Sequence, residues 1–234
     1  MLAAIDLHDQ ALIKECITEL DSQFPGSARV KRLKIIARLE LRERYEDALK
    51  AYDEMIKKDE SNSLFYKRKV AILLAQQRIS DAIKELVDYL KKFMNDHEGW
   101  LELSDLYIQE QEYTKAAFCI EEVIMINPHN NLYHQRYAEI QYTIGTFESL
   151  ELARAYFSQA LKLSASNMRA LFGLYVTATA LANHSKTTSQ KKKENHKLAA
   201  TTLSLINKAY KDKDNDEMVS SLDSLMSNLA INSN

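Results

Sequence analysis

The strongest constraint in this 234-residue sequence is an alanine that recurs at nearly constant spacing. The copies lie 34, 34 and 37 residues apart and comprise Ala48, Ala82, Ala116 and Ala153. A large apolar residue follows each alanine by four positions, in the order Tyr52, Leu86, Ile120 and Phe157. Self-similarity at a period of about 20–50 residues is typical of repeat architectures.

A third column completes each repeat. Fourteen positions after each alanine stands a polar residue suited to begin a helix: Asn62, Asp96, Asn130 and Asn167. Such side chains accept hydrogen bonds from the unpaired N–H groups of a helix N-terminus. The alanine is expected where two helices cross closely, with the large residue one turn later filling the space beside it. The spacing therefore predicts stacked helix–turn–helix pairs, because one pair cannot bury its apolar face alone.

This period and pattern resemble the tetratricopeptide repeat, and residues 97–130 match it best. The matching residues in that segment are Trp100, Leu103, Ser104, Tyr107, Ala116, Ile120 and Pro128. The resemblance implies an all-α fold, namely a tetratricopeptide-repeat helical solenoid. The first helices of the preceding repeats depart from the pattern. Lys69, for example, stands at a repeat position where an apolar residue is expected.

The expected organisation is one run of repeats followed by a cap. Tetratricopeptide-like repeats are predicted for residues 1–183, and an exposed polar loop for 184–196, which includes the lysines 191–193. Apolar spacing then predicts capping helices within 197–230 and a tail at 231–234. About a dozen helices result. We interpret the lysine run as a solvated loop, with contact to acidic lipid or RNA as the alternative.

Composition supports long helices and excludes several other classes. The chain has four glycines and two prolines, where average usage would give roughly 16 and 12. A β-sandwich, barrel or Rossmann sheet needs more such turn residues. With 31 basic and 33 acidic residues, the formal charge of −2 does not favour nucleic acid as a partner. No apolar run approaches the ~20 residues of a membrane span. The N-terminal residues lack the basic region and the apolar core of a signal peptide.

No motif for catalysis, a cofactor or a metal is found. The glycines are isolated, and His129 and His134 are five residues apart rather than the four of a helical metal pair. Cys119 is expected to be a small buried apolar residue rather than a nucleophile. Cys16 is too distant in sequence to suggest a disulfide framework. We therefore expect a non-catalytic binding scaffold with no cofactor.

The tetratricopeptide resemblance implies a concave face formed by the first helix of each pair. Its expected residues are Glu98, Leu101, Asp105, Ile108, Leu132, Gln135, Glu139 and Tyr142. A second candidate contact is a basic stretch comprising Arg29, Lys31, Arg32, Lys34 and Arg38. We interpret that stretch as the polar side of a repeat helix, with a partner's acidic segment or headgroups as the alternative.

The concave residues bear on the partner's chemistry. Co-chaperones with this fold bind a C-terminal carboxylate through Lys, Asn and Arg, whereas this chain has Leu101 and Asp105 at positions of that clamp. We expect the carboxylates of Glu98, Asp105 and Glu139 to repel such a ligand. The groove is then expected to bind an apolar or basic helix or extended segment of a partner protein.

A more specific resemblance lies in irregular details that the generic repeat does not require. Residues 23–33, 113–119, 127–130, 156–163 and 167–175 resemble the family of endoplasmic reticulum (ER) membrane protein complex subunit 2. The details include Phe24-Pro25-Gly26-Ser27 and Asn127-Pro128-His129-Asn130. The resemblance also implies that the N-terminal extension usual in the family is lacking here.

This resemblance implies a scaffold on the cytosolic side of the ER, peripheral to the membrane. Such a subunit would join the membrane-embedded subunits to a second soluble one, in a complex that inserts tail-anchored and multipass proteins. Membrane contact would be indirect, through partners. The alternative is a free cytosolic tetratricopeptide adaptor or co-chaperone that binds a partner peptide.

Overall fold

A computed structural model describes residues 1–211 of the chain, and they form helices and turns. The protein divides into two compact units, Met1–Asp96 and a second that begins at His97. This division was not predicted from the sequence, although it falls at the start of the best-matched repeat. No helix in residues 1–211 is long and apolar enough to cross a membrane.

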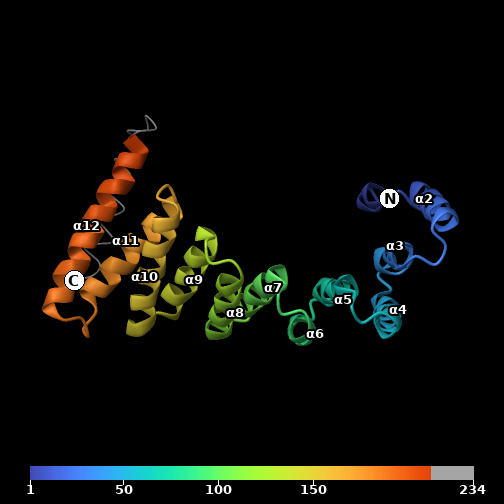
Figure 1. Cartoon of the computed structure of the whole chain (residues 1–234), viewed down its shortest axis with the longest axis horizontal. Helices are drawn as coiled ribbons and strands as arrows, with labels where there is room; N and C mark the ends of the chain where they lie inside the picture. The colour runs from blue at the N-terminus through green and yellow to red at the C-terminus, as the bar shows by residue number, and fades with distance from the viewer. Residues whose placement is uncertain (212–234) are drawn as a thin grey trace. The chain divides into compact units, whose positions relative to one another are not determined.

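The first unit contains three helix pairs and one short 3₁₀ helix (Figure 1). Its elements are α1 (Leu2–Asp6), α2 (Gln10–Gln23), α3 (Ala28–Arg38), η1 (Glu40–Arg42), α4 (Tyr45–Lys58), α5 (Ser63–Ala75) and α6 (Ile79–Lys92). Each helix packs against the next along the chain, as repeats in a solenoid do.

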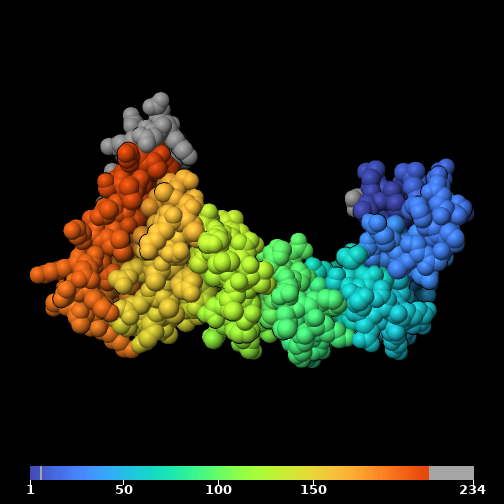
Figure 2. Space-filling model, in the orientation of Figure 1, coloured from blue at the N-terminus to red at the C-terminus, as the bar shows by residue number. Residues whose placement is uncertain are grey.

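The second unit continues the same alternation over six described helices. These are α7 (His97–Gln109), α8 (Tyr113–Ile126), α9 (Asn131–Ile144), α10 (Phe147–Leu163), α11 (Met168–Asn183) and α12 (Ser189–Lys211). Neighbouring helices of this unit meet without interruption in the space-filling view (Figure 2). The first helices α9 and α11 also contact each other directly, which places their side chains on one common face.

The repeat columns form the core, as the spacing predicted. The four repeat alanines, Ala48, Ala82, Ala116 and Ala153, are fully buried, and the large apolar residue one turn later is buried in every repeat. Buried Ser104 on α7 donates a hydrogen bond to the Ala116 carbonyl on α8 at 3.1 Å. This contact accounts for a small residue at both positions, because the two helices approach closely there.

The three asparagines among the predicted helix-starting residues act as caps. The side chains of Asn62, Asn130 and Asn167 accept hydrogen bonds from the backbone N–H groups of Leu64, Leu132 and Ala170. Asp96 accepts from the Tyr89 hydroxyl and forms an ion pair with Lys67. Pro128 follows the end of α8, and its carbonyl oxygen lies 2.7 Å from His134 Nε2.

The turns within three of the pairs use the left-handed region without glycine. Glu43, Gln77 and Gln111 each stand five residues before a repeat alanine and have φ between 57° and 60°. In each turn, the next N–H reaches back five residues to a helix carbonyl, as Glu112 does to Tyr107 at 2.8 Å. This is the Schellman arrangement, which usually places glycine at the left-handed position.

Lys69, which stands in an apolar column, is accommodated by two carboxylates. Its ammonium lies 2.8 Å from both Asp53 on α4 and Glu85 on α6, and its side chain is only 15% exposed. Burial alone lowers the pKa of Lys69, but the hydrogen bonds to Asp53 and Glu85 outweigh it and raise that pKa overall. The charge is therefore kept at the junction of three helices.

The predicted loop at 184–196 is wrong over most of its length. Helix α12 begins at Ser189, so the connection is confined to residues 184–188 and the lysines 191–193 are helical. Contacts with α10 explain this, since Lys191 pairs with Glu151 at 2.6 Å and Arg154 donates to buried Asn195 at 2.6 Å. The part of the predicted capping region 197–230 that follows residue 211, and the tail at 231–234, lie outside the described residues.

Candidate protein-binding groove

A groove of about 480 Å³ lies on the face formed by the first helices of the second unit. Helices α9 and α11 supply nine of the twelve lining residues, and α7, α8 and α10 supply one residue each. The lining residues are Ile108, Tyr113, Arg136, Glu139, Ile140, Tyr142, Thr143, Phe157, Arg169, Phe172, Gly173 and Val176. Most of this surface is apolar, as in sites that bind a segment of another protein.

The repeat positions these side chains. Ile108 and Tyr142 each stand twelve residues after a helix-starting residue, and Glu139 and Val176 each stand nine after one. Equivalent positions on stacked first helices point to the same side. The lining therefore follows from the spacing of Asp96, Asn130 and Asn167 rather than from any local motif.

The structure brings three of the eight predicted concave residues into the groove. Ile108, Glu139 and Tyr142 line it, and Tyr142 is exposed. Leu101 is half-buried and packs against the core around Ala116 and Ile120.

The other four predicted concave residues lie outside the lining. Glu98, Asp105 and Leu132 are exposed and do not belong to the lining. Gln135 is buried, because it donates to Glu139 at 2.8 Å and accepts from Asn167 at 2.8 Å. Its side chain is therefore used within the protein, and its prediction as a binding residue is wrong.

Nine of the twelve lining residues were not predicted as binding residues, and they include Arg136, Arg169, Phe172 and Val176. Three of these follow Asn167 at the same offsets as predicted residues follow Asn130 in the preceding repeat. The predicted concave residues stop at Tyr142, because the offsets were not carried one repeat further. Continuing them to 169, 172 and 176 would have found these three residues.

An alternating row of charges crosses the groove. Arg136 pairs with Asp105 at 2.7 Å, and Arg169 pairs with Glu139 at 2.5 Å. Arg136 also lies 3.9 Å from Glu139. The arginine side chains are 70% exposed at Arg169 and 40% at Arg136, whereas Glu139 is 21% exposed.

This arrangement corrects the expected acidity of the concave face. The carboxylates of Asp105 and Glu139 are balanced by arginines, so they do not act as repelling charges toward a ligand. Among the charged residues that line the groove, two are basic and one is acidic. The row of two arginines and two carboxylates is neutral overall, so the groove suits an apolar segment. An acidic group on that segment is favoured near Arg169, whose side chain is far more exposed than that of its partner Glu139.

The predicted basic stretch lies on α3 in the first unit. Arg29, Lys31 and Arg38 are exposed, whereas Lys34 pairs with Asp21 at 2.6 Å. Arg32 is half-buried. Three of the five predicted residues are thus accessible, and their contact with a partner stays a prediction.

Cys119 lies in an environment that does not favour reactivity. Cys119 is buried, and burial, together with the nearby Glu122, raises its pKa to about 12. Its thiol is therefore protonated near neutral pH, unlike a catalytic cysteine. Within residues 1–211, no group of three His, Cys, Asp or Glu side chains is placed to hold a metal ion.

Comparisons with known proteins agree on one family. The family model of the EMC2 TPR-like repeat domain matches residues 27–163. ER membrane protein complex subunit 2-A of Xenopus laevis is 51% identical over 210 residues, which are 90% of this chain and 70% of that protein. The subunit 2 of Dictyostelium discoideum is 30% identical over 231 residues, which are 94% of this chain and 71% of that protein.

Solved structures agree on the fold. A crystal structure of MamA aligns with a TM-score of 0.54 and 14% identity, covering 77% of this chain and 92% of that one. At this identity the likeness concerns the fold alone. The all-α tetratricopeptide-repeat architecture predicted from the sequence is confirmed by the helical structure, the family model and the structural neighbours.

Proposed function

Because this chain belongs to the family of ER membrane protein complex subunit 2, we propose that it is a scaffold subunit of that complex with no catalytic activity of its own. The observation that carries the proposal is the 51% identity that extends over 90% of the chain. In this role the protein supports the insertion of tail-anchored and multipass proteins into the ER membrane. It lies on the cytosolic face and attaches through partner subunits.

The groove is the surface that we assign to one of these partners. An amphipathic or extended segment of another subunit places its apolar side chains against Ile108, Tyr142 and Val176. An acidic group of that segment meets Arg136 and Arg169, which are the most exposed charges of the lining. Displaced water and apolar contact supply affinity, while the charged row sets the register of the segment.

The scaffold joins membrane-embedded subunits to a second soluble subunit. The two compact units offer separate surfaces for this purpose, with the groove in the second unit and the exposed cations of α3 in the first. Rigid helix pairs suit this task, because they hold a binding surface in shape before the partner arrives.

Purification in mild detergent tests the assignment. A tagged chain expressed in cells should recover the other subunits of the ER membrane protein complex from solubilised membranes, as identified by mass spectrometry. Recovery of chaperones alone would favour a free adaptor instead. A synthetic peptide that ends in Glu-Glu-Val-Asp serves as the control for chaperone-type binding. We expect it not to bind, because Leu101 and Asp105 stand where the carboxylate clamp requires Lys and Asn.

A further inference from the structure

The second helices of the pairs carry lysines at two recurring positions, and α8 is the one of the four that lacks lysine at both. Two residues after the repeat alanine, the four repeats have Lys50, Lys84, Phe118 and Ala155. Nine residues after it, they have Lys57, Lys91, Met125 and Lys162. Helix α8 thus replaces a recurring lysine with an apolar residue at both positions.

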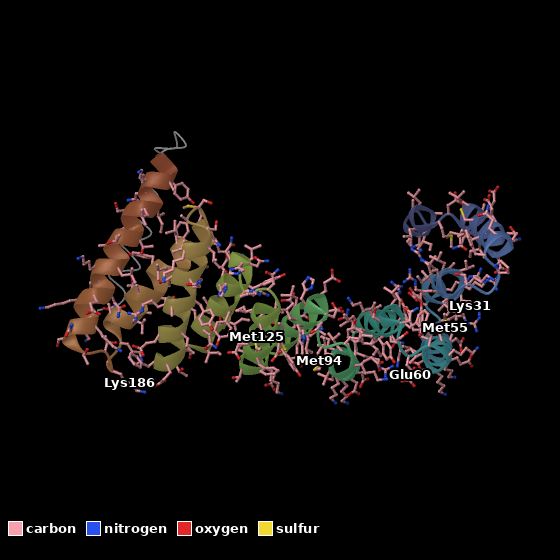
Figure 3. The ribbon with its side chains drawn as sticks, in the orientation of Figure 1. Lys31, Met55, Glu60, Met94, Met125 and Lys186 are labelled. Atoms are coloured by element: carbon pink, nitrogen blue, oxygen red, sulfur yellow. The ribbon has the colours of Figure 1, made fainter. Side chains whose placement is uncertain are left out.

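These two apolar side chains are exposed to solvent. Phe118 is 53% exposed and Met125 is 77% exposed (Figure 3 labels Met125). They stand seven residues apart on α8, so they lie on the same side of the helix. Ile126 beside them is also exposed, and the Phe118 ring contacts the Trp100 ring edge-on at a centroid distance of 6.1 Å. We call Phe118, Met125 and Ile126 the α8 patch.

The C-terminal turn of α8 also lacks a favourable charge that the equivalent helices have. The last turns of α4, α6 and α10 contain lysines, whereas the last turn of α8 contains no basic residue. A cation there interacts favourably with the negative end of the helix dipole. Helix α8 therefore exposes both apolar side chains and unneutralised carbonyl groups at one place.

The charges around the α8 patch are mainly acidic. Glu121 and Glu122 stand between Phe118 and Met125 on the helix. The nearest lysine in the sequence, Lys115, is paired with Glu112 at 3.3 Å. A partner that covers the patch is thus favoured when it brings apolar side chains together with its own positive charges.

We propose that the α8 patch binds an amphipathic helical segment of a partner protein, whose lysine or arginine side chains flank its apolar face. The partner's cations take the place of the lysines that α4, α6 and α10 carry themselves. This surface is formed by a second helix of a pair, whereas the groove described above is formed mainly by first helices. It therefore provides a second docking site, beyond the function proposed above, and favours the opposite ligand charge.

The only tryptophan of the chain reports on this site, because Trp100 contacts Phe118. The probe is a tryptophan-free amphipathic helical peptide of leucine and lysine, titrated into the full chain. We expect saturable binding with a shift of the Trp100 emission to shorter wavelength. A peptide with glutamate in place of lysine should bind at least about tenfold more weakly.

The matched variant is Phe118→Lys combined with Met125→Lys, which copies the residues found in the second repeat. Both positions are exposed, so the fold and its thermal stability should be retained. Affinity for the lysine peptide should fall at least about tenfold, measured by calorimetry because the Trp100 signal is itself altered. The control variant Leu205→Lys changes an exposed leucine on α12 and should bind as the wild type does.

Several results would overturn the proposal. These are absence of binding of the lysine peptide to the wild type, equal binding of the glutamate peptide, and undiminished binding to the double variant. Neutral phosphatidylcholine vesicles form a further arm of the titration. An emission shift with vesicles that the lysine peptide does not reproduce would assign the patch to a lipid surface instead.

Discussion

The ring of Phe157 on α10 lies directly against the backbone of Gly173 on α11. A Cβ atom placed on Gly173 would come within 2.3 Å of the ring's Cζ atom. Phe157 is buried, so its ring has little room to move away. A glycine inside a helix ordinarily costs stability, and this contact explains why one is present here.

Gly173→Ala should therefore destabilise the second unit, despite the better helix propensity of alanine. Overpacking of about 1–3 kcal/mol exceeds the roughly 1 kcal/mol gained from propensity. Urea unfolding measures the change. The double variant Phe157→Leu/Gly173→Ala should lose less than the sum of the single variants, because leucine leaves space for the new methyl group. Strict additivity would place the two residues out of contact.

Gln111→Gly should stabilise the protein, which is unusual for a change to glycine. Gln111 has a φ of 60° in the turn between α7 and α8. Relief of the left-handed strain is worth about 0.5–1 kcal/mol. Thermal denaturation should show a higher melting temperature. Gln109→Gly, at the last residue of α7, is the control and should lower it.

Lys69→Met should destabilise the first unit by about 1–3 kcal/mol, because Asp53 and Glu85 lose their shared cation. Restoring neutrality with Asp53→Asn and Glu85→Gln should recover much of the loss in urea unfolding. No recovery would mean that the side chain's packing matters more than its charge.

Lys69 also makes the stability of the first unit depend on pH in alkaline solution. Its pKa is raised in the folded state above the ordinary 10.5, so its stabilising effect is complete below that pH. The effect is lost as pH rises through the folded pKa. The stability difference between wild type and Lys69→Met should therefore shrink in alkaline solution and stay constant from pH 7 to 9.

The two cysteines should differ in reactivity. Burial and Glu122 raise the pKa of Cys119 to about 12, whereas Cys16 is partly exposed on α2. A thiol reagent such as Ellman's reagent should modify Cys16 quickly and Cys119 only on unfolding. Cys16→Ser should remove the fast phase. A fast phase that persists in this variant would show that Cys119 is accessible.

The core could be predicted from the sequence because it depends on strict spacing. Ala48, Ala82, Ala116 and Ala153 had to be buried for helix pairs to stack. The left-handed turns could not be predicted, because Glu43, Gln77 and Gln111 give no glycine signal. Helix α12 was partly missed because its first turns are polar and are held by residues about 40 positions earlier, as in the Lys191–Glu151 pair.

The groove was predictable only in part, at positions that depend on the spacing of the repeat alone. Ile108 and Tyr142 follow from the offset after a helix-starting residue, which requires only sequence. The balance of charge in the groove could not be predicted from the spacing. Arg169 pairs with Glu139 on another helix, and the two residues are 30 positions apart in sequence. Pairing of this kind depends on how successive repeats stack, and no local sequence pattern predicts it.

The most direct test of the scaffold role uses Tyr142→Asp in the intact complex. Tyr142 is exposed in the groove, whereas Leu101 packs into the core and is a poorer choice. A buried charge at a binding hot spot costs at least about 2 kcal/mol, which is more than a tenfold loss of affinity. Leu205→Asp on α12 is the matched control, because it places the same charge at an exposed leucine outside the groove.

The measurement is quantitative mass spectrometry of the subunits that co-purify with each variant in mild detergent, with circular dichroism to verify the fold. We predict that the amount of at least one subunit of the ER membrane protein complex that co-purifies with Tyr142→Asp falls tenfold or more. Leu205→Asp should retain all subunits. A folded Tyr142→Asp protein that still recovers every subunit at wild-type levels would contradict the account.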